Sequence, residues 1–162
     1  MKKLSAKRTQ RASLRATKNL VEELGGRLVP GSGSGLEKGD GRVDGRFRIE
    51  TKRPPTRKYR LTYKEWMKVR DAALRANEVP IFHIMLGAVE LIVLREADYE
   101  GFGGTEEGYD LSNGSTSFLF TEQSLAAVPY GGHLNVWIGD GKTFFELRAM
   151  YRSDFIKLAE AQ

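Results

Sequence analysis

The chain of 162 residues contains no cysteine, only two histidines and five prolines. Without cysteine it has no disulfide framework, no thiolate nucleophile and no zinc–thiolate site. It also lacks a long apolar run, since His83 and Glu90 interrupt its most hydrophobic stretch, residues 79–94. A membrane-spanning helix needs about 20 apolar residues. The basic start, residues 1–11, is not followed by the apolar segment of a secretory signal. We therefore expect a cytoplasmic protein that does not span a membrane.

What the chain does contain is an uneven charge. Hydrophobic residues make up 40% and charged residues 29%, as is typical of a globular protein with a core of its own. Residues 1–78 hold 21 Lys and Arg against 9 Asp and Glu, whereas residues 79–162 hold 5 against 12. Clustered cations favour a polyanionic partner, because Lys and Arg that neutralise phosphates release counterions. Nucleic acid is the leading candidate, and a solubilising basic surface is the alternative.

Helix and strand signals follow one another at the start of the chain. Residues 1–10 are basic and poorly patterned, and we expect them to form a mobile arm. Leucines at helical spacing predict a helix over residues 13–24, which a pair of glycines ends. A short strand, residues 27–30, then enters the glycine-serine segment 31–35. We favour a functional loop there over a flexible linker, because linkers rarely separate two short strands of one small unit.

Turn signals predict three hairpins and a second helix. The turns are Asp44-Gly45 between residues 39–43 and 46–52, Gly87 between 81–86 and 89–94, and Asp140-Gly141 between 135–138 and 143–150. Thr62 and Glu65 have the spacing of a capping box, which opens a helix to about residue 76. Its expected buried stripe is Trp66, Val69, Ala73 and Leu74.

The last third of the chain is harder to interpret. Residues 101–117 are rich in glycine and polar residues, which predicts a long loop before a short strand at 118–120. Glu90-Leu91 and Asp98-Tyr99 recur 56 residues later, as Glu146-Leu147 and Asp154-Phe155. In both places a strand leads to a short helix that begins near the aspartate. We interpret this as the same residue types serving two similar strand-to-helix connections, because four positions are too few to establish a duplication.

The first predicted hairpin carries the residues that suit a chemical site. Side chains alternate along a strand, so Glu50 and Lys52 share one face of the strand 46–52. If the hairpin turns as predicted, Asp40 lies across from about Ile49, within diagonal reach of Glu50. Two carboxylates and a lysine then converge at the open end of the hairpin.

This combination suits metal-assisted hydrolysis of a phosphodiester. Mg²⁺ prefers oxygen ligands and lowers the pKa of the water that it binds, and we expect Mn²⁺ to substitute for it. Asp40 and Glu50 would hold the metal, and the backbone carbonyl of Thr51 would add a ligand. Lys52 would orient the attacking water and stabilise the charge that develops on the phosphate. The alternative is that the two carboxylates pair with neighbouring cations on a solvated face.

Four features of the sequence follow one another in a recognisable order. They are a helix that Gly25-Gly26 ends before a short strand, then Val29-Pro30-Gly31-Ser32-Gly33-Ser34, then Lys38-Gly39-Asp40, then Ile49-Glu50-Thr51-Lys52. This arrangement resembles the PD-(D/E)XK nuclease superfamily, specifically the archaeal-type and phage Holliday junction resolvases and phage endonuclease I. The resemblance covers about residues 10–95, since the next helix and strand also follow the family's order. It implies an α/β fold with a restriction-endonuclease-like three-layer core and a mixed β-sheet.

The resemblance also implies a site and a substrate. Its active-site triad is Asp40, Glu50 and Lys52, and its substrate is branched or four-way DNA cut by a symmetric homodimer. The families usually carry a glutamate on the first helix, but residues 16–18 of this chain, where it is expected, are not acidic. Glu22 would replace that metal ligand if the helix is shifted.

Contacts to DNA are expected from residues on both sides of the triad. The resemblance implies that Ser32 contacts DNA near the scissile phosphate. Cations that directly follow the active-site strand suit phosphate contacts, with a solvated basic loop as the alternative. The full expected set is Ser32, Ser34, Lys38, Arg48, Arg53, Arg57, Lys58 and Arg60.

Together these patterns predict two units and one leading function. Residues 1–100 form the nuclease core with its basic arm, and residues 101–162 form a small, acidic, β-rich unit of unknown role. The expected function is a Mg²⁺-dependent, structure-selective DNA endonuclease that resolves four-way junctions, in the host cytoplasm if a phage encodes it. The alternatives are a PD-(D/E)XK nuclease of other DNA-processing specificity and a catalytically silent DNA-binding module.

Overall fold

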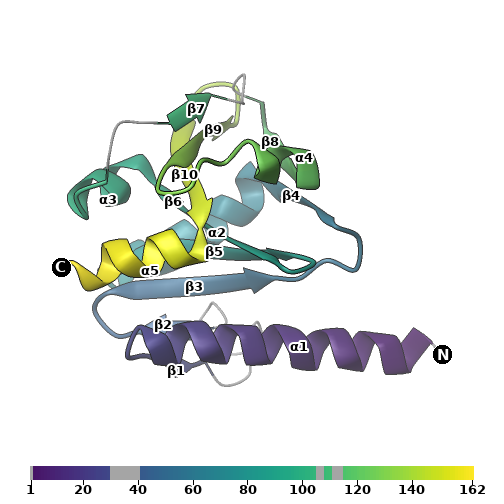
Figure 1. Cartoon of the computed structure of the whole chain (residues 1–162). Coiled ribbons are helices and arrows are strands. Elements are labelled where there is room, and N and C mark those ends of the chain that lie inside the picture. Colours follow the sequence, from purple (N-terminus) through teal and green to yellow (C-terminus); the bar gives the residue numbers. More distant parts are fainter. Residues whose placement is uncertain (1, 30–40, 105–107, 111–114) are drawn as a thin grey trace.

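The computed structural model describes residues 2–29, 41–104, 108–110 and 115–162, which form a mixed sheet flanked by helices (Figure 1). The elements in chain order are α1 (Lys2–Glu23), β1 (Arg27–Leu28), β2 (Gly41–Val43), β3 (Phe47–Lys52), β4 (Lys58–Thr62), α2 (Tyr63–Arg75), β5 (Val79–Leu86), β6 (Val89–Arg95), α3 (Glu96–Gly101), β7 (Gly108–Asp110), β8 (Ser117–Thr121), α4 (Glu122–Ala126), β9 (His133–Gly139), β10 (Phe144–Tyr151) and α5 (Arg152–Glu160). None of the helices in the described ranges is long and apolar enough to cross a membrane.

The sheet separates two hydrophobic cores. Eight strands pair in the order β1-β2-β3-β5-β6-β10-β9-β7, and β4 pairs with β8 in a separate two-stranded sheet. On one face, residues of α1, α3 and α5 pack against alternate residues of β3, β5 and β6. On the other face, α2, α4 and the β4–β8 pair cover the opposite residues of β5 and β6 together with β9 and β10. The predicted α/β class with a mixed sheet is therefore confirmed.

The first helix is longer than the sequence predicted. α1 begins at Lys2, so the expectation of a mobile arm over residues 1–10 is wrong. Residues 2–10 contain no glycine or proline and several good helix formers, so nothing in them stops the helix. The C-terminal end is as predicted, because Gly25 adopts φ +81° and the amide of Gly26 bonds back to the carbonyl of Val21.

The first predicted hairpin is confirmed. β2 and β3 pair antiparallel, and Gly45 takes the positive φ of +70° that the turn requires. The amide of Arg46 bonds to the carbonyl of Val43 at 2.9 Å and closes the turn. Gly41 is the partner of Ile49, the position that the sequence analysis gave to Asp40. The register is therefore shifted by one residue from the predicted one.

The second helix is capped by Thr62 as predicted, but Glu65 has a different hydrogen-bond partner from the predicted one. The Thr62 side chain accepts a bond from the amide of Glu65 at 3.2 Å. The Glu65 carboxylate does not complete the capping box on Thr62; it accepts a bond from the hydroxyl of Tyr59 at 2.7 Å. The prediction of Leu74 in the buried stripe is wrong, because that side chain is 39% exposed. The buried residues of α2 are Trp66, Val69, Ala72 and Ala73.

Six of the eight strands, β3 to β7 in the sheet order, are arranged symmetrically about the β6–β10 pair. β3 runs parallel to β5 as β7 does to β9, the hairpins β5–β6 and β9–β10 correspond, and β6 pairs antiparallel with β10. Val93 pairs with Ala149, and in the smaller sheet Arg60 pairs with Leu119. These two pairs lie at the middle of the β6–β10 and β4–β8 ladders, and their partners are 56 and 59 residues apart in the sequence. This similar offset indicates a pseudo-two-fold axis that passes through both pairs. The four residue types that recur 56 positions apart therefore belong to a topological unit that occurs twice in the fold. The interpretation as strand-to-helix connections alone was too narrow.

The symmetric arrangement of strands extends across the boundary between two units that the sequence predicted near residue 100. The strands beyond that position continue the same sheet, since β10 pairs with β6 and β9 pairs with β10. Residue 100 itself lies inside α3. The segment 101–162 thus supplies half of the symmetric arrangement, while α1, β1 and β2 are additions at the β3 edge.

Candidate active site

Strand β3 presents its alternate residues to different faces of the sheet. Phe47 and Ile49 pack with α1 and α5, and Thr51 faces the same way because its hydroxyl bonds to Thr17 of α1. Glu50 and Lys52 consequently project toward the face that carries α2 and β4. The structure therefore brings together these two residues of the predicted triad.

The two side chains form a partly exposed ion pair. Lys52 Nζ lies 3.2 Å from Glu50 Oε1, and the side chains are 33% and 20% exposed. Water and a phosphate oxygen can therefore reach both groups. Glu50 Oε1 is the kind of hard oxygen donor that Mg²⁺ prefers, so this part of the donor set fits the expected metal.

Tyr59 and Glu65 were not predicted as site residues, but they lie near this pair. Tyr59 of β4 donates its hydrogen bond to Glu65 of α2, and its hydroxyl also experiences the negative charge of Glu50. Burial, the bond to Glu65 and the two carboxylates raise the pKa of Tyr59 far above its ordinary value. The phenol stays protonated and remains a hydrogen-bond donor beside Glu50. The alternation of β4 and the capping-box glutamate were the available signals, but neither indicated that they meet β3.

Thr51 is held from the other face of the sheet. Its hydroxyl lies 2.7 Å from that of Thr17 and 3.5 Å from Nδ1 of His83 in β5. Nε2 of His83 lies 3.1 Å from the carboxylate of Glu90 in β6. This hydrogen bond is the main cause that holds the pKa of Glu90 below its ordinary value. A buried polar chain thus fixes the segment of β3 that lies between Glu50 and Lys52.

The structure does not bring Glu22 beside Glu50. Glu22 lies on an exposed part of α1, where its carboxylate is 3.7 Å from Nζ of Lys18. α1 packs against the face of β3 that carries Thr51, whereas Glu50 points to the other face. Thr17 of α1 instead bonds to Thr51, which lies between Glu50 and Lys52 in β3.

The predicted DNA contacts that lie within the described ranges fall into two groups. Arg48 is 5% exposed, and its guanidinium donates to the fully buried carboxylate of Glu78, which also accepts from Arg42. It belongs to a buried ion-pair cluster. The second group, Arg53, Arg57, Lys58 and Arg60, is exposed along the segment that follows β3.

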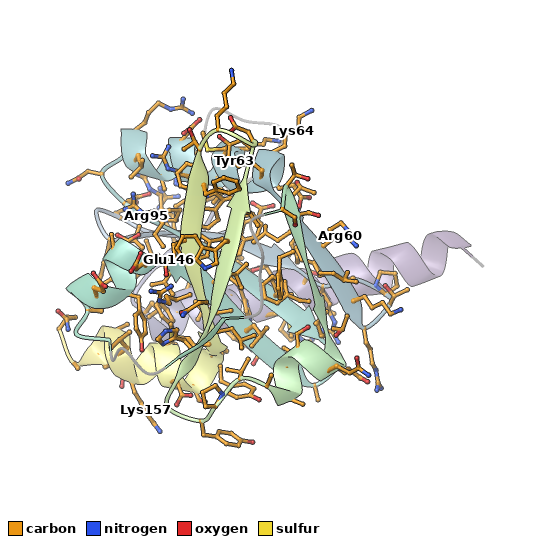
Figure 2. The ribbon with its side chains drawn as sticks, turned by 90° about the horizontal axis from the view of Figure 1, so that it is seen from above. Arg60, Tyr63, Lys64, Arg95, Glu146 and Lys157 are labelled. Carbon is orange, nitrogen blue, oxygen red and sulfur yellow. The ribbon has the colours of Figure 1, made fainter. Side chains whose placement is uncertain are left out.

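The exposed group has few internal partners. Arg57 is 71% exposed and pairs with Glu122 at 3.0 Å, while Arg60 donates to the hydroxyl of Ser117 at 2.9 Å. Figure 2 shows Arg60 pointing outward on the side of the molecule toward which α1 projects. These cations are therefore available to solvent and to a charged ligand.

Several selected residues lie outside the described ranges. They are Ser32, Ser34, Lys38 and Asp40. Within the ranges that the structure describes, no group of three or more His, Asp or Glu side chains is placed to hold a metal. The metal-ligand assignment of Asp40 thus remains a prediction from the sequence.

Comparisons with known proteins give no independent assignment. The chain matches no protein-family model, no curated protein and no solved structure.

Proposed function

We propose that the protein is a Mg²⁺-dependent, structure-selective DNA endonuclease that resolves four-way and other branched DNA in the cytoplasm. The observation that carries the proposal is the hairpin β2–β3, which presents Glu50 and Lys52 together on one partly exposed face. The order α1, β1, β2–β3, α2 and β5, with β5 parallel to β3, supports the PD-(D/E)XK resemblance, although β4 stands between β3 and α2.

Each group at the site has a distinct task in hydrolysis. Glu50, Asp40 and the carbonyl of Thr51 would hold Mg²⁺, which would lower the pKa of a bound water and polarise the phosphate. The Lys52 ammonium orients that water and stabilises negative charge on the phosphate oxygens. The water oxygen would attack phosphorus and lose a proton to solvent, the bond to the leaving oxygen would break, and the leaving oxygen would take up a proton from solvent. The anchored Thr51 keeps Glu50 and Lys52 in register during these steps.

The pseudo-two-fold repeat does not supply a second site. The pairing of Ile49 with Ile81 corresponds to that of Gly108 with His133, so the equivalent of Glu50 is Tyr109. A tyrosine cannot replace a carboxylate as a metal ligand of the same charge. One chain therefore makes one cut, and paired cuts across a junction require two chains, which we propose form a homodimer.

The test compares a labelled four-way junction with a linear duplex of the same sequence, in Mg²⁺ or EDTA. We expect paired, Mg²⁺-dependent cuts in the junction and none in the duplex. Glu50→Gln, Lys52→Ala and Asp40→Asn should abolish cutting and preserve binding, because these groups serve the metal and the transition state. The matched controls Glu160→Gln and Lys157→Ala change exposed charges on α5 and should cut normally.

Other outcomes would reassign the protein. Equal cutting of linear duplex would indicate a nuclease of other DNA-processing specificity. Full activity of Glu50→Gln or Lys52→Ala would contradict the site. Tight junction binding without cutting in Mg²⁺ or Mn²⁺ would indicate a DNA-binding module without catalysis. The position of Glu22 away from Glu50 is the observation that favours this second candidate.

A further inference from the structure

α1 extends well past the sheet on which it packs. Its contact with Thr51, near the end of β3, is made by Thr17, and the helix begins at Lys2. The 15 residues before Thr17 span about 22 Å at 1.5 Å per residue. Figure 1 shows α1 antiparallel to β3, with its N-terminal end beyond the arrowhead of that strand.

The projecting part of α1 is rich in positive charge. The helix sequence contains seven Lys and Arg before its first acidic residue, Glu22. Basic positions recur at intervals of four and three residues, the spacing of one helix face, at Lys3, Lys7, Arg11, Arg15 and Lys18. Arg11 and Arg15 are exposed, and no ion pair joins either of them to an acid among the residues that the structure describes.

A second basic segment lies at the same end of β3. Arg53 follows Lys52 directly, and Arg57 and Lys58 are exposed on the way into β4. In Figure 1 the link between β3 and β4 lies on the side toward which α1 projects. Two basic segments therefore flank the end of the strand that carries Glu50 and Lys52.

The chemistry of this surface favours a phosphate backbone over a lipid surface. A helix that lies in a membrane interface needs an exposed apolar face opposite its charges. Within the described part of α1, Leu14 is the one large apolar side chain that is exposed, at 55%. A row of cations suits regularly spaced phosphates, since each contact releases counterions.

We propose that the projecting half of α1 is a DNA-binding arm that lies along a duplex arm of the substrate. Its span of about 22 Å corresponds to roughly six base pairs at 3.4 Å per phosphate step. The arm therefore contacts backbone phosphates on the duplex up to about six base pairs from the cut. This inference rests on the proposed function, for which it names the surface that holds the substrate.

The test measures junction binding in EDTA, by fluorescence anisotropy over a range of salt, for the full chain and for Arg11→Gln/Arg15→Gln. Glutamine has a helix propensity close to that of arginine, so α1 should stay folded. We expect weaker binding and a fall of about 1.8 in the slope of log K against log salt, from two lost contacts. The control Lys142→Gln/Lys157→Gln removes the same charge elsewhere, and Figure 2 shows Lys157 on the side away from the projecting end of α1.

A second measurement locates the arm on the substrate. On junctions trimmed to arms of about four base pairs, the loss of binding caused by Lys3→Gln/Lys7→Gln should shrink, because at 1.5 Å per residue these positions lie about 15–21 Å before Thr17. An unchanged slope for Arg11→Gln/Arg15→Gln, or the same loss in the control, would overturn the proposal. Binding to phosphatidylserine vesicles that depends on Arg11 and Arg15, with unchanged DNA binding, would assign the arm to a membrane instead.

The two proposals fail in different ways. DNA binding that depends on Arg11 and Arg15, without cleavage, would reject the nuclease and keep the arm. Junction cleavage with binding that ignores both arginines would reject the arm and keep the nuclease.

Discussion

The hydroxyl of Thr17 lies 2.7 Å from the hydroxyl of Thr51, and this hydrogen bond joins the first helix to the proposed catalytic strand. The Thr17 hydroxyl also bonds to the carbonyl of Ser13 at 2.9 Å. The Thr51 hydroxyl lies 3.5 Å from Nδ1 of His83. Nε2 of His83 lies 3.1 Å from the carboxylate of Glu90. The four residues form a hydrogen-bonded chain that links α1, β3, β5 and β6.

Replacement of Thr51 by valine tests this chain. Thr51→Val keeps the shape of the side chain, but leaves the buried hydroxyl of Thr17 and the ring of His83 without that partner. We expect a loss of about 1–3 kcal/mol in the free energy of unfolding. Urea unfolding, followed by tryptophan fluorescence, measures the loss. The exposed control Thr56→Val should unfold like the original chain, and equal midpoints for both variants would contradict a structural role for the buried hydroxyl.

What the sequence could predict depends on the range of the interactions. The three hairpin turns were predictable because Gly45, Gly87 and Gly141 each adopt a positive φ between two extended segments. The start of α2 was predictable because the Thr62 cap acts within four residues. The start of α1 was missed, since basic residues without apolar periodicity also suit a solvated helix that projects from the body.

The candidate site was predictable to the same extent. Alternation along β3 is local, so the shared face of Glu50 and Lys52 followed from the sequence. The contacts of Tyr59 with Glu65 and of Thr51 with His83 depend on how distant strands and helices pack. The burial of Arg48 was missed for the same reason, because its partner Glu78 is 30 residues away.

Glu78 gives a second prediction. Its side chain is fully buried and accepts bonds from Arg42, from Arg48 and from the amide of Gly45 at 3.2 Å, so it ties the β2–β3 hairpin to the start of β5. Glu78→Ala should lower the free energy of unfolding by about 3–5 kcal/mol, because it removes a buried carboxylate that pairs with the buried Arg48 guanidinium. The measurement is again the urea midpoint.

A double variant at Arg48 and Glu78 distinguishes the effect of an unpaired buried charge from the effect of lost packing. In Arg48→Met/Glu78→Met the buried cation is removed with its partner, so we expect a smaller loss than for Glu78→Ala. A double variant less stable than the single one would show that the geometry of the hairpin depends on the ions themselves. The exposed control Glu160→Gln should have no effect on the midpoint.

Glu96 and Glu146 give a prediction on pH. Their carboxyl groups share a hydrogen bond at the start of α3, and Arg148 lies 3.0 Å from one and 2.8 Å from the other. The bond to Glu146, followed by burial, raises the pKa of Glu96 to about 7, while Arg148 opposes the shift. The folded state thus binds a proton that the unfolded chain releases near pH 4.5.

The sign of the effect follows from that raised pKa. The stabilisation is fully present below about pH 4.5 and is lost as pH rises through about 7, so the free energy of unfolding should fall across this window. The amide of Glu96→Gln donates a hydrogen bond at every pH. The variant should therefore lack the decrease in the free energy of unfolding that comes from deprotonation of Glu96. We therefore expect the urea midpoint of Glu96→Gln, measured from pH 5 to 8, to rise relative to that of the original chain as pH rises. Because Glu96 is 35% exposed, solvent screens the pair and the divergence should be small. Parallel curves would show that the two carboxyl groups titrate independently.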